Sequence, residues 1–503
     1  MPAGLRGIAR GTSANLIGAA VTGVVNFGLT VAVTHGLSKT AAGVFFSATS
    51  LFLLATSIGQ LGTDTGLVYF ISRCRALGNP ERISGYMRTA AVPVFLTALV
   101  MGAGLLIFAP QLGQLTNPAH AGQATSYLRI LALLVPVAGL ESVALAGTSG
   151  LGTMRPNALI DLIGRAIVQI VLVLIVLATE PTAALLALAW GLPYLPAAIA
   201  AWWSWSRRRQ RIAQGPDVRA SGSGAEFWRF TAPRSISSVI QIAMQRFDIV
   251  LVGGLAGAAT AAVYAASTRF IVAGQMGSNA VSRATRPRLG AALARANRTE
   301  AQHIYQSATA WLVVVTWPIY LMLLVFSDRL LHVFGHGYST GRPVLIILSL
   351  AMMVATGCGM VDAVLNMGGK TTWNLANVAL AFGTNLGLDL WLIPPYGVLG
   401  ASIGWGVAIF LQNVVPLTQV AFVLHLHPFG RATLTAMAIA VACFAAVPGL
   451  VRIGLGSTWT GLFVGLVIGI AAYLALLWRF RGVLALPGLR TLLPRAATTR
   501  GSR

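Results

Sequence analysis

The sequence has few charged residues and very few acidic ones. Only 9% of its 503 residues are Asp, Glu, Lys or Arg, and just 12 are Asp or Glu, whereas a soluble globular protein carries roughly 25% charged residues. Its three cysteines share no pairing pattern, and nucleophile elbows, phosphate-binding loops and His-Glu-x-x-His runs are absent. These absences argue against an ordinary soluble enzyme, ATP hydrolysis, a disulfide framework and a cysteine-based metal site.

Apolar residues and arginine are abundant instead. Hydrophobic residues make up 56% of the chain, and 35 Lys and Arg give a net charge of +23. All of these cations except Lys39 and Lys370 are arginine. Positive charge of this size suits nucleic acid or an anionic membrane surface, and the apolar composition favours the membrane. Nucleic acid is therefore not an expected partner.

Long apolar runs predict membrane-spanning helices. A bilayer core of about 30 Å requires roughly 20 apolar residues per helix. The chain is expected to be an all-α polytopic membrane protein with about fourteen transmembrane helices, near residues 12–35, 41–70, 87–109, 125–150, 157–178, 183–204, 226–252, 259–282, 304–327, 341–367, 372–394, 399–424, 431–451 and 457–478.

The distribution of cations predicts the orientation of these helices. With the N-terminus inside, 26 of the 35 Lys and Arg fall in inner segments, four fall outside and five lie within the spans. Cytoplasmic loops are enriched in Lys and Arg. Both termini are therefore expected in the cytoplasm.

An internal repeat predicts two lobes. At a shift of 218 residues, eight residues of the first half fall on identical residues of the second, including Phe52 on Phe270. Two six-helix lobes in the same orientation are expected, with a substrate site between them. The predicted segments are the N-lobe at 1–206, a cytoplasmic linker at 207–225, the C-lobe at 226–425, two extra helices at 426–479 and a basic cytoplasmic tail at 480–503.

Polar residues inside the predicted spans are candidates for a substrate site, because such groups are costly at membrane depth. In the span 226–252, four of them lie near one line of the helix: Arg234, Gln241, Gln245 and Asp248. This polar stripe either lines a hydrated cavity or packs against other helices with its charges satisfied. Asn15 and Asn26 form a matching stripe on the first helix, and Asp64 and Arg269 are polar residues of the spans 41–70 and 259–282.

Three charged residues have open interpretations. Asp161 and Arg165 are four residues apart, which is the spacing of a helical ion pair, so the pair is either structural or functional. Glu141 lies deep in its span and either titrates or stays protonated and hydrogen-bonded. Arg129 is close enough to the outer end of its span to reach the interface.

A cation site is suggested by oxygen-bearing side chains at similar depth. Asn385 and Asp389 are one helical turn apart, and Asp248 is equally far from the outer end of its own helix. Carboxylate and amide oxygens suit a small cation or a proton. The alternative is ordinary hydrogen bonding between helices.

Several motifs resemble those of the polysaccharide-transporter branch of the multidrug/oligosaccharidyl-lipid/polysaccharide (MOP) exporter superfamily, which is related to the lipid II flippases. The matching segments are Arg10-Gly11, residues 61–67, Phe247-Asp248, residues 263–266, residues 335–338 and residues 393–401. The resemblance covers almost the whole chain.

The resemblance implies a V-shaped, two-lobed transporter, not an enzyme, in the bacterial cytoplasmic membrane. It would flip a polyprenyl-diphosphate-linked glycan to the outer leaflet by alternating access. The cation site of lipid II flippases maps onto Asp248, Asn385, Asp389 and Ser402, which implies Na⁺ or H⁺ as the coupling ion and no other cofactor. Residues 426–479 would form a groove for the lipid tail, and the expected partners are membrane lipids and a polysaccharide polymerase or glycosyltransferases.

The cationic residues within the spans suggest how the cargo is bound. Arg234 and Arg269, with Arg165 and Arg246, are expected to bind the diphosphate through charge-assisted hydrogen bonds. The polar stripes would hydrate the sugars. The alternatives are a multidrug or cation antiporter of the same superfamily and a membrane-embedded glycosyltransferase or polymerase.

Overall fold

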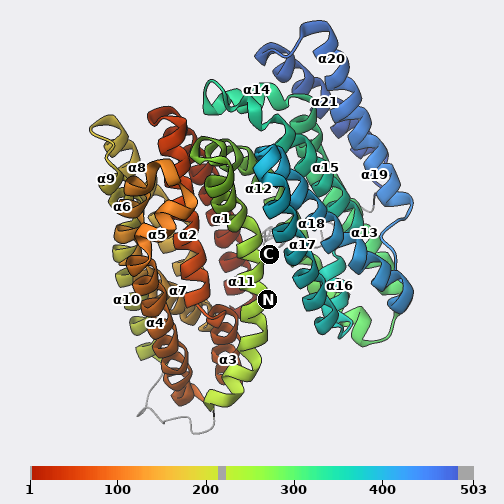
Figure 1. Cartoon of the computed structure of the whole chain (residues 1–503). Helices are drawn as coiled ribbons and strands as arrows, with labels where there is room; N and C mark the ends of the chain where they lie inside the picture. Colours follow the sequence, from red (N-terminus) through yellow and green to blue (C-terminus); the bar gives the residue numbers. More distant parts are fainter. Residues whose placement is uncertain (1–2, 213–222, 485–503) are drawn as a thin grey trace, which may run out of the picture. The chain divides into compact units, whose positions relative to one another are not determined.

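The computed structural model describes residues 3–212 and 223–484. The side chains of residues 3–17 and of scattered positions in two later helices, including Arg234, lie outside this description. The same holds for most of the predicted linker and of the predicted basic tail. Within the described ranges the regular secondary structure is entirely helical (Figure 1), which confirms the all-α prediction.

The packing of the helices divides the chain into two units. Unit 1 comprises Met1–Ala266 and Ile393–Val398, and unit 2 comprises Ser267–Leu392 and Leu399–Arg503. The helices of unit 1 are α1 (Ala3–Gly36), α2 (Lys39–Gly59), α3 (Thr63–Ala76), η1 (Pro80–Arg82), α4 (Ile83–Ile107), α5 (Ala109–Thr116), η2 (Pro118–His120), α6 (Ala121–Ala132), α7 (Val135–Gly150), η3 (Asn157–Arg165), α8 (Ala166–Ala178), α9 (Ala183–Gly191), α10 (Tyr194–Ile212) and α11 (Ser223–Ala256).

Unit 2 begins within α12 (Ala258–Ala294). Its further helices are α13 (Arg298–Val325), α14 (Ser327–Leu331), η4 (His332–Phe334), η5 (Tyr338–Gly341), α15 (Arg342–Cys358), α16 (Val361–Met367), α17 (Thr371–Tyr396), α18 (Val398–Gln419), η6 (Val420–Leu424), α19 (Arg431–Val441), η7 (Ala442–Ala446), α20 (Val447–Leu455) and α21 (Trp459–Arg479).

Thirteen of the fourteen predicted spans are recovered as segments that are long and apolar enough to cross a membrane. Twelve are single spans, and one is the pair Pro118–Ala132 and Val135–Gly150, which meet at 42°. The expected span 259–282 falls within α12, a helix of 37 residues that is not counted among them. Twelve or thirteen spans within the described ranges agree with the prediction of about fourteen.

A break in the second predicted span shapes unit 1. The chain leaves α2 and starts α3 through Leu61 and Gly62, whose φ angles are +50° and +60°. Two consecutive left-handed residues cannot continue an α-helix. They redirect α3 so that it packs against the first half of α11, where the Ser235 hydroxyl donates a hydrogen bond to the carbonyl oxygen of Leu61.

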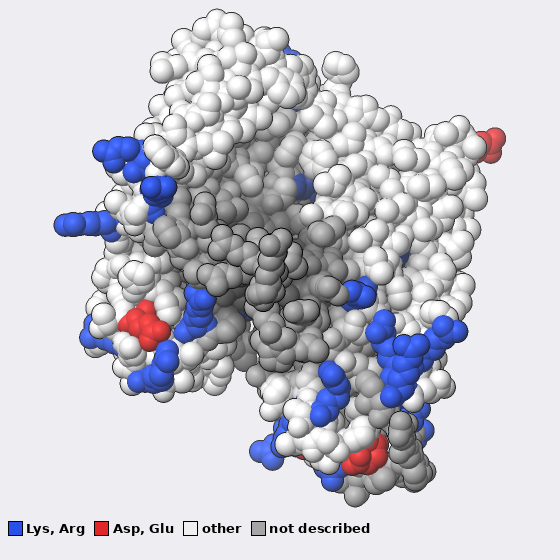
Figure 2. All heavy atoms as spheres, turned by 180° about the vertical axis from the view of Figure 1, so that it is seen from behind, with Lys and Arg blue, Asp and Glu red and all other residues white. Residues whose placement is uncertain are grey.

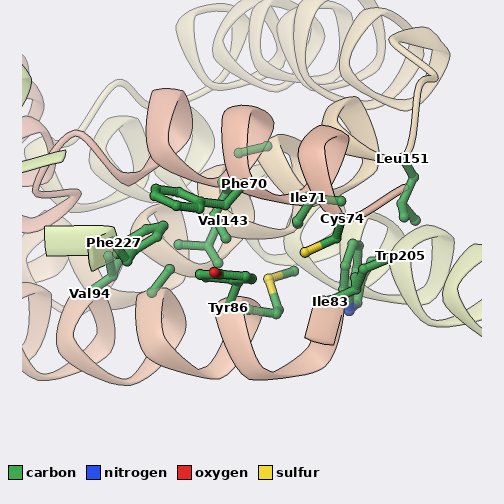
Figure 3. Packing of buried hydrophobic residues seen from close by; sticks show 14 residues of the cluster. Phe70, Ile71, Cys74, Ile83, Tyr86, Val94, Val143, Leu151, Trp205 and Phe227 are labelled. Carbon is green, nitrogen blue, oxygen red and sulfur yellow. The ribbon is translucent and has the colours of Figure 1, made fainter. Parts of the chain in front are cut away.

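Aromatic side chains fill the contact between α3 and α11. Phe70 packs between Tyr86 and Phe227 with ring centroids 4.9 and 5.5 Å away (Figure 3). Tyr69 stacks on Phe230 at 4.4 Å. The α11 helix belongs to unit 1, where its most extensive packing is against α2, although the sequence repeat would place it at the start of the second lobe, so the lobe boundaries stay a prediction.

The last helices of the chain pack within unit 2. Buried residues of α19, η7 and α21 form one hydrophobic cluster with residues of α13. The Tyr473 hydroxyl of α21 donates a hydrogen bond of 2.8 Å to the carbonyl oxygen of Val314. The two predicted extra helices are therefore attached to α13, and their role as a lipid groove stays a prediction.

We predict that Gly62→Ala destabilises the protein more than Gly78→Ala does. Both glycines have positive φ angles, +60° and +71°, so each alanine costs about 1–2 kcal/mol in backbone strain. A Cβ at Gly62 would also come within 2.7 Å of the Ser235 Cα, whereas nothing lies within 4 Å of a Cβ at Gly78. Thermal unfolding of the two purified variants measures the difference, and equal melting temperatures would contradict the prediction.

Candidate functional site

The predicted ion pair of η3 forms in unit 1. The Arg165 Nε donates a hydrogen bond of 2.7 Å to the Asp161 Oδ1. The Arg165 guanidinium also lies over the ring of Tyr194 on α10, with Cζ 4.4 Å from the ring centroid. The Arg165 guanidinium thus contacts both a carboxylate and an aromatic ring within unit 1. The expected contact of Arg165 with a diphosphate stays a prediction.

The structure separates the members of the predicted stripe on α11. Gln241 and Gln245 are exposed, Arg246 is partly buried and Asp248 is buried. Arg246 lies near enough to Tyr194 for the two groups to interact electrostatically. Arg165 and Arg246, which are 81 positions apart in the sequence, therefore have the same tyrosine as a neighbour.

Asp248 has a partner that sequence reasoning did not identify. The Tyr264 hydroxyl, on the first part of α12, donates a hydrogen bond of 2.9 Å to the Asp248 Oδ2. Both residues are buried and belong to unit 1. Tyr264 lies in the segment 263–266 that carried the family resemblance, but that motif gave no sign of the contact with Asp248.

The remaining predicted residues of unit 1 are not gathered into a cluster. Asn26 on α1 and Asp64 on α3 are exposed. The side chains of Asn15 and Arg234 lie outside the described part of the chain, so their predicted contacts with sugar and diphosphate stay predictions. On α1, Thr22 donates a hydrogen bond of 2.5 Å to the carbonyl oxygen of Leu162, which fixes α1 against η3.

Unit 2 contains a compact polar cluster on α17. The Asn385 Nδ2 donates a hydrogen bond of 2.7 Å to the Asp389 Oδ2. Asn385 is 2% exposed and Asp389 is fully buried. The Asn385 Oδ1 is buried as well and accepts no hydrogen bond from the described residues, so an amide oxygen is available as a ligand.

One residue of α18 lies against this cluster, and another residue of α18 is a predicted ligand. Gly404 lies so close to Asp389 that a methyl group in its place would overlap the Asp389 carboxylate. Ser402, one of the predicted ligands, is fully buried on the same helix. The absence of a side chain at Gly404 thus leaves α18 in contact with the carboxylate.

The predicted cation ligands are distributed over both units. Asn385, Asp389 and Ser402 belong to unit 2, whereas Asp248 belongs to unit 1. Arg269 is partly buried on α12, just after the residue where the two units divide. Among the described residues, no group of three or more His, Cys, Asp or Glu could hold a metal ion.

Comparisons with known structures decide the kind of fold. The lipid II flippase MurJ in an inward closed conformation superposes with a TM-score of 0.71 at 13% identity, over 93% of this chain and 99% of that one. The chain therefore has the same fold as this transporter structure. This confirms the resemblance that the sequence motifs predicted, at the level of the fold.

Two further transporter structures match less completely. An inward-facing MATE multidrug resistance transporter gives a TM-score of 0.57 at 18% identity over 80% of this chain and 96% of that one. A MOP transporter from Pyrococcus furiosus gives 0.55 at 17% identity over 82% and 95%. The MatE family model matches residues 233–391. No curated protein sequence matches the chain.

We predict that Gly404→Ala weakens the stabilisation of the protein by Na⁺, because the added methyl group displaces the Asp389 carboxylate. Perturbing a neighbour of a metal ligand typically lowers affinity about 10- to 100-fold. The measurement is the rise of the melting temperature with Na⁺ concentration at constant ionic strength.

The matched control for this experiment is Gly387→Ala, on α17 between Asn385 and Asp389, where nothing lies within 4 Å of an added Cβ. We expect the control to keep the wild-type response to Na⁺. An identical Na⁺ response in all three proteins, or none in wild type, would refute the cation site.

Proposed function

We propose that the protein is a transporter, not an enzyme, that flips a polyprenyl-diphosphate-linked oligosaccharide from the inner to the outer leaflet of the bacterial cytoplasmic membrane. The observation that carries this proposal is the match over 93% of the chain to a structure described as a lipid II flippase. Alternating access would expose the cargo to each side in turn. A polysaccharide polymerase or glycosyltransferases would act before or after the flipping step.

Arginines at membrane depth support an anionic cargo. Arg246 lies within the candidate span Val239–Ala256 and is partly buried, and Arg269 is partly buried on α12. A guanidinium stays charged under all physiological conditions and binds phosphate oxygens with two parallel hydrogen bonds. Arg234 and Arg165 would contribute to the same diphosphate site, and Asn15, Asn26, Asp64, Gln241 and Gln245 would contact water and sugar hydroxyls.

The polar cluster of α17 supports coupling to a cation. Asp389, Asn385 and Ser402, together with Asp248, provide the hard oxygen ligands that suit Na⁺ or a proton. The membrane potential also favours transport of this cargo, because moving an anion outward is downhill by about 2.3 kcal/mol per charge per 100 mV. Cation entry would then return the empty carrier.

The basic ends of the helices support a cytoplasmic location of the inner loops. Lys and Arg side chains are far more widespread than Asp and Glu side chains on the face shown in Figure 2. Exposed arginines near the ends of spans include Arg73, Arg75, Arg82 and Arg211. They would hold the protein against anionic lipid head groups.

A second candidate function is export of cationic drugs. The observation that favours it is the match of residues 233–391 to the MatE family model, together with the MATE structures. Such a transporter would export cationic dyes in exchange for Na⁺ or protons. It would not move the lipid-linked glycan.

We predict that Arg269→Ala lowers the rate of flipping about tenfold or more. A hydrogen bond to a charged group contributes about 1.5–3 kcal/mol, and about 1.4 kcal/mol corresponds to a factor of ten. The measurement uses proteoliposomes that contain a polyprenyl diphosphate with a fluorescent sugar, and a membrane-impermeant quencher reports its arrival in the other leaflet.

The control for charge alone is Arg82→Ala, because Arg82 is exposed at the end of a span; this variant is expected to flip at the wild-type rate. Full flipping by Arg269→Ala would contradict the diphosphate site. Export of a cationic dye by wild type, without flipping of the lipid, would favour the drug transporter.

A further inference from the structure

Glu141 is a buried carboxylate in unit 1 that the proposed transport does not use. It lies on α7, and its side chain is 4% exposed. The charged groups that act on it are Asp161 and Arg165, both on η3. Of the other elements packed against α7, α10 contributes Tyr194 next to Arg165, and Arg246 of α11 acts on Tyr194 in turn. The charged residues of α3 and α4, including Asp64, Arg73 and Arg88, are largely exposed.

One guanidinium is shared by two carboxylates. The Arg165 Nε donates to the Asp161 Oδ1 at 2.7 Å, whereas the same nitrogen lies 3.9 Å from the Glu141 Oε1. The first contact is a hydrogen bond and the second is beyond hydrogen-bond distance. Asp161 therefore holds Arg165 more closely than Glu141 does, and the three residues carry a net charge of −1 when both carboxylates are ionised.

One oxygen of the Glu141 carboxylate, the buried Oε1, receives no hydrogen bond from the described residues. A buried charge without hydrogen bonds or close pairing is strongly unfavourable. Arg246 of α11, the other cation of this region, interacts electrostatically with Tyr194.

We propose that the Glu141 carboxyl is a proton-binding site of unit 1, which shares Arg165 with Asp161 and is distinct from the cation cluster of α17. Binding transfers one proton from water to the Glu141 carboxylate and forms an O–H bond. No other bond changes, and the charge of the three residues goes from −1 to 0. Release of the proton restores the competition of the two carboxylates for Arg165.

Proton binding at Glu141 affects the position of η3. Arg165 is the last residue of η3, and this segment is a π-helix, a rare form that often occurs at functional sites. It is fixed to α1 by the hydrogen bond from Thr22 to Leu162. Arg165 contacts Tyr194, and η3 is bonded to α1. A change in the distances from Arg165 to Glu141 and Asp161 is therefore expected to shift α1 and Tyr194 as well. That this proton drives transport rests on the proposed function.

Infrared difference spectroscopy of the purified protein tests the site directly. We expect a pH-dependent carboxyl C=O stretching band that Glu141→Gln lacks and Glu180→Gln keeps, since Glu180 is exposed in a loop. In Asp161→Asn, Arg165 pairs with Glu141 alone, and the midpoint of the band is expected about 1–3 pH units lower.

A band that persists in Glu141→Gln, or none in wild type, would overturn the proton site. If Glu141→Gln does not fold, Asp161→Asn decides, and an unchanged midpoint overturns the proposal. Proteoliposome flipping under an imposed pH gradient separates the two proposals. If wild type flips the lipid but shows no pH-dependent band, only the proton site is refuted. If wild type shows the band but does not flip the lipid, only the proposed function is refuted.

Discussion

Acidic residues are much fewer than basic residues in this protein. Their positions determine where ion pairs and buried polar clusters form in each unit. The chain has 12 acids for 35 Lys and Arg, and a charge at membrane depth is costly unless it is compensated nearby. Most acids that form ion pairs do so near helix ends, as Glu226 does with Arg73 and Asp362 with Arg286. Such exposed pairs contribute little to stability. Among the acids inside the helices, Glu141, Asp248 and Asp389 are buried, and each has a functional interpretation.

One end of unit 2 follows the same rule. Asp328 on α14 is contacted by Arg342 at 3.4 Å and by Arg452 at 2.9 Å, which ties α20 to the ends of α13 and α15. One carboxylate thus connects the last helices of the chain to the rest of the unit. The last helices are therefore an integral part of unit 2.

The break at Leu61 and Gly62 redirects the chain between α2 and α3. It sends α3 against α11, and the aromatic rings between them bind a helix of the predicted second lobe to unit 1. The sequence motif 61–67 carried the family resemblance, but nothing in it indicated that Ser235 would approach Gly62. Contact between residues about 170 positions apart depends on the packing of whole helices, which local spacing does not encode.

Hydrophobic runs in the sequence determined the helical class and thirteen of the fourteen expected spans, because a bilayer core sets their length. The spacing of Asp161 with Arg165 and of Asn385 with Asp389 foretold two contacts, since residues one turn apart on a helix are neighbours in any fold. Tertiary structure alone brought Tyr264 to Asp248 and Glu141 to Arg165. These contacts join different helices, and the depth, rotation and kinks that set them depend on packing against the rest of the unit.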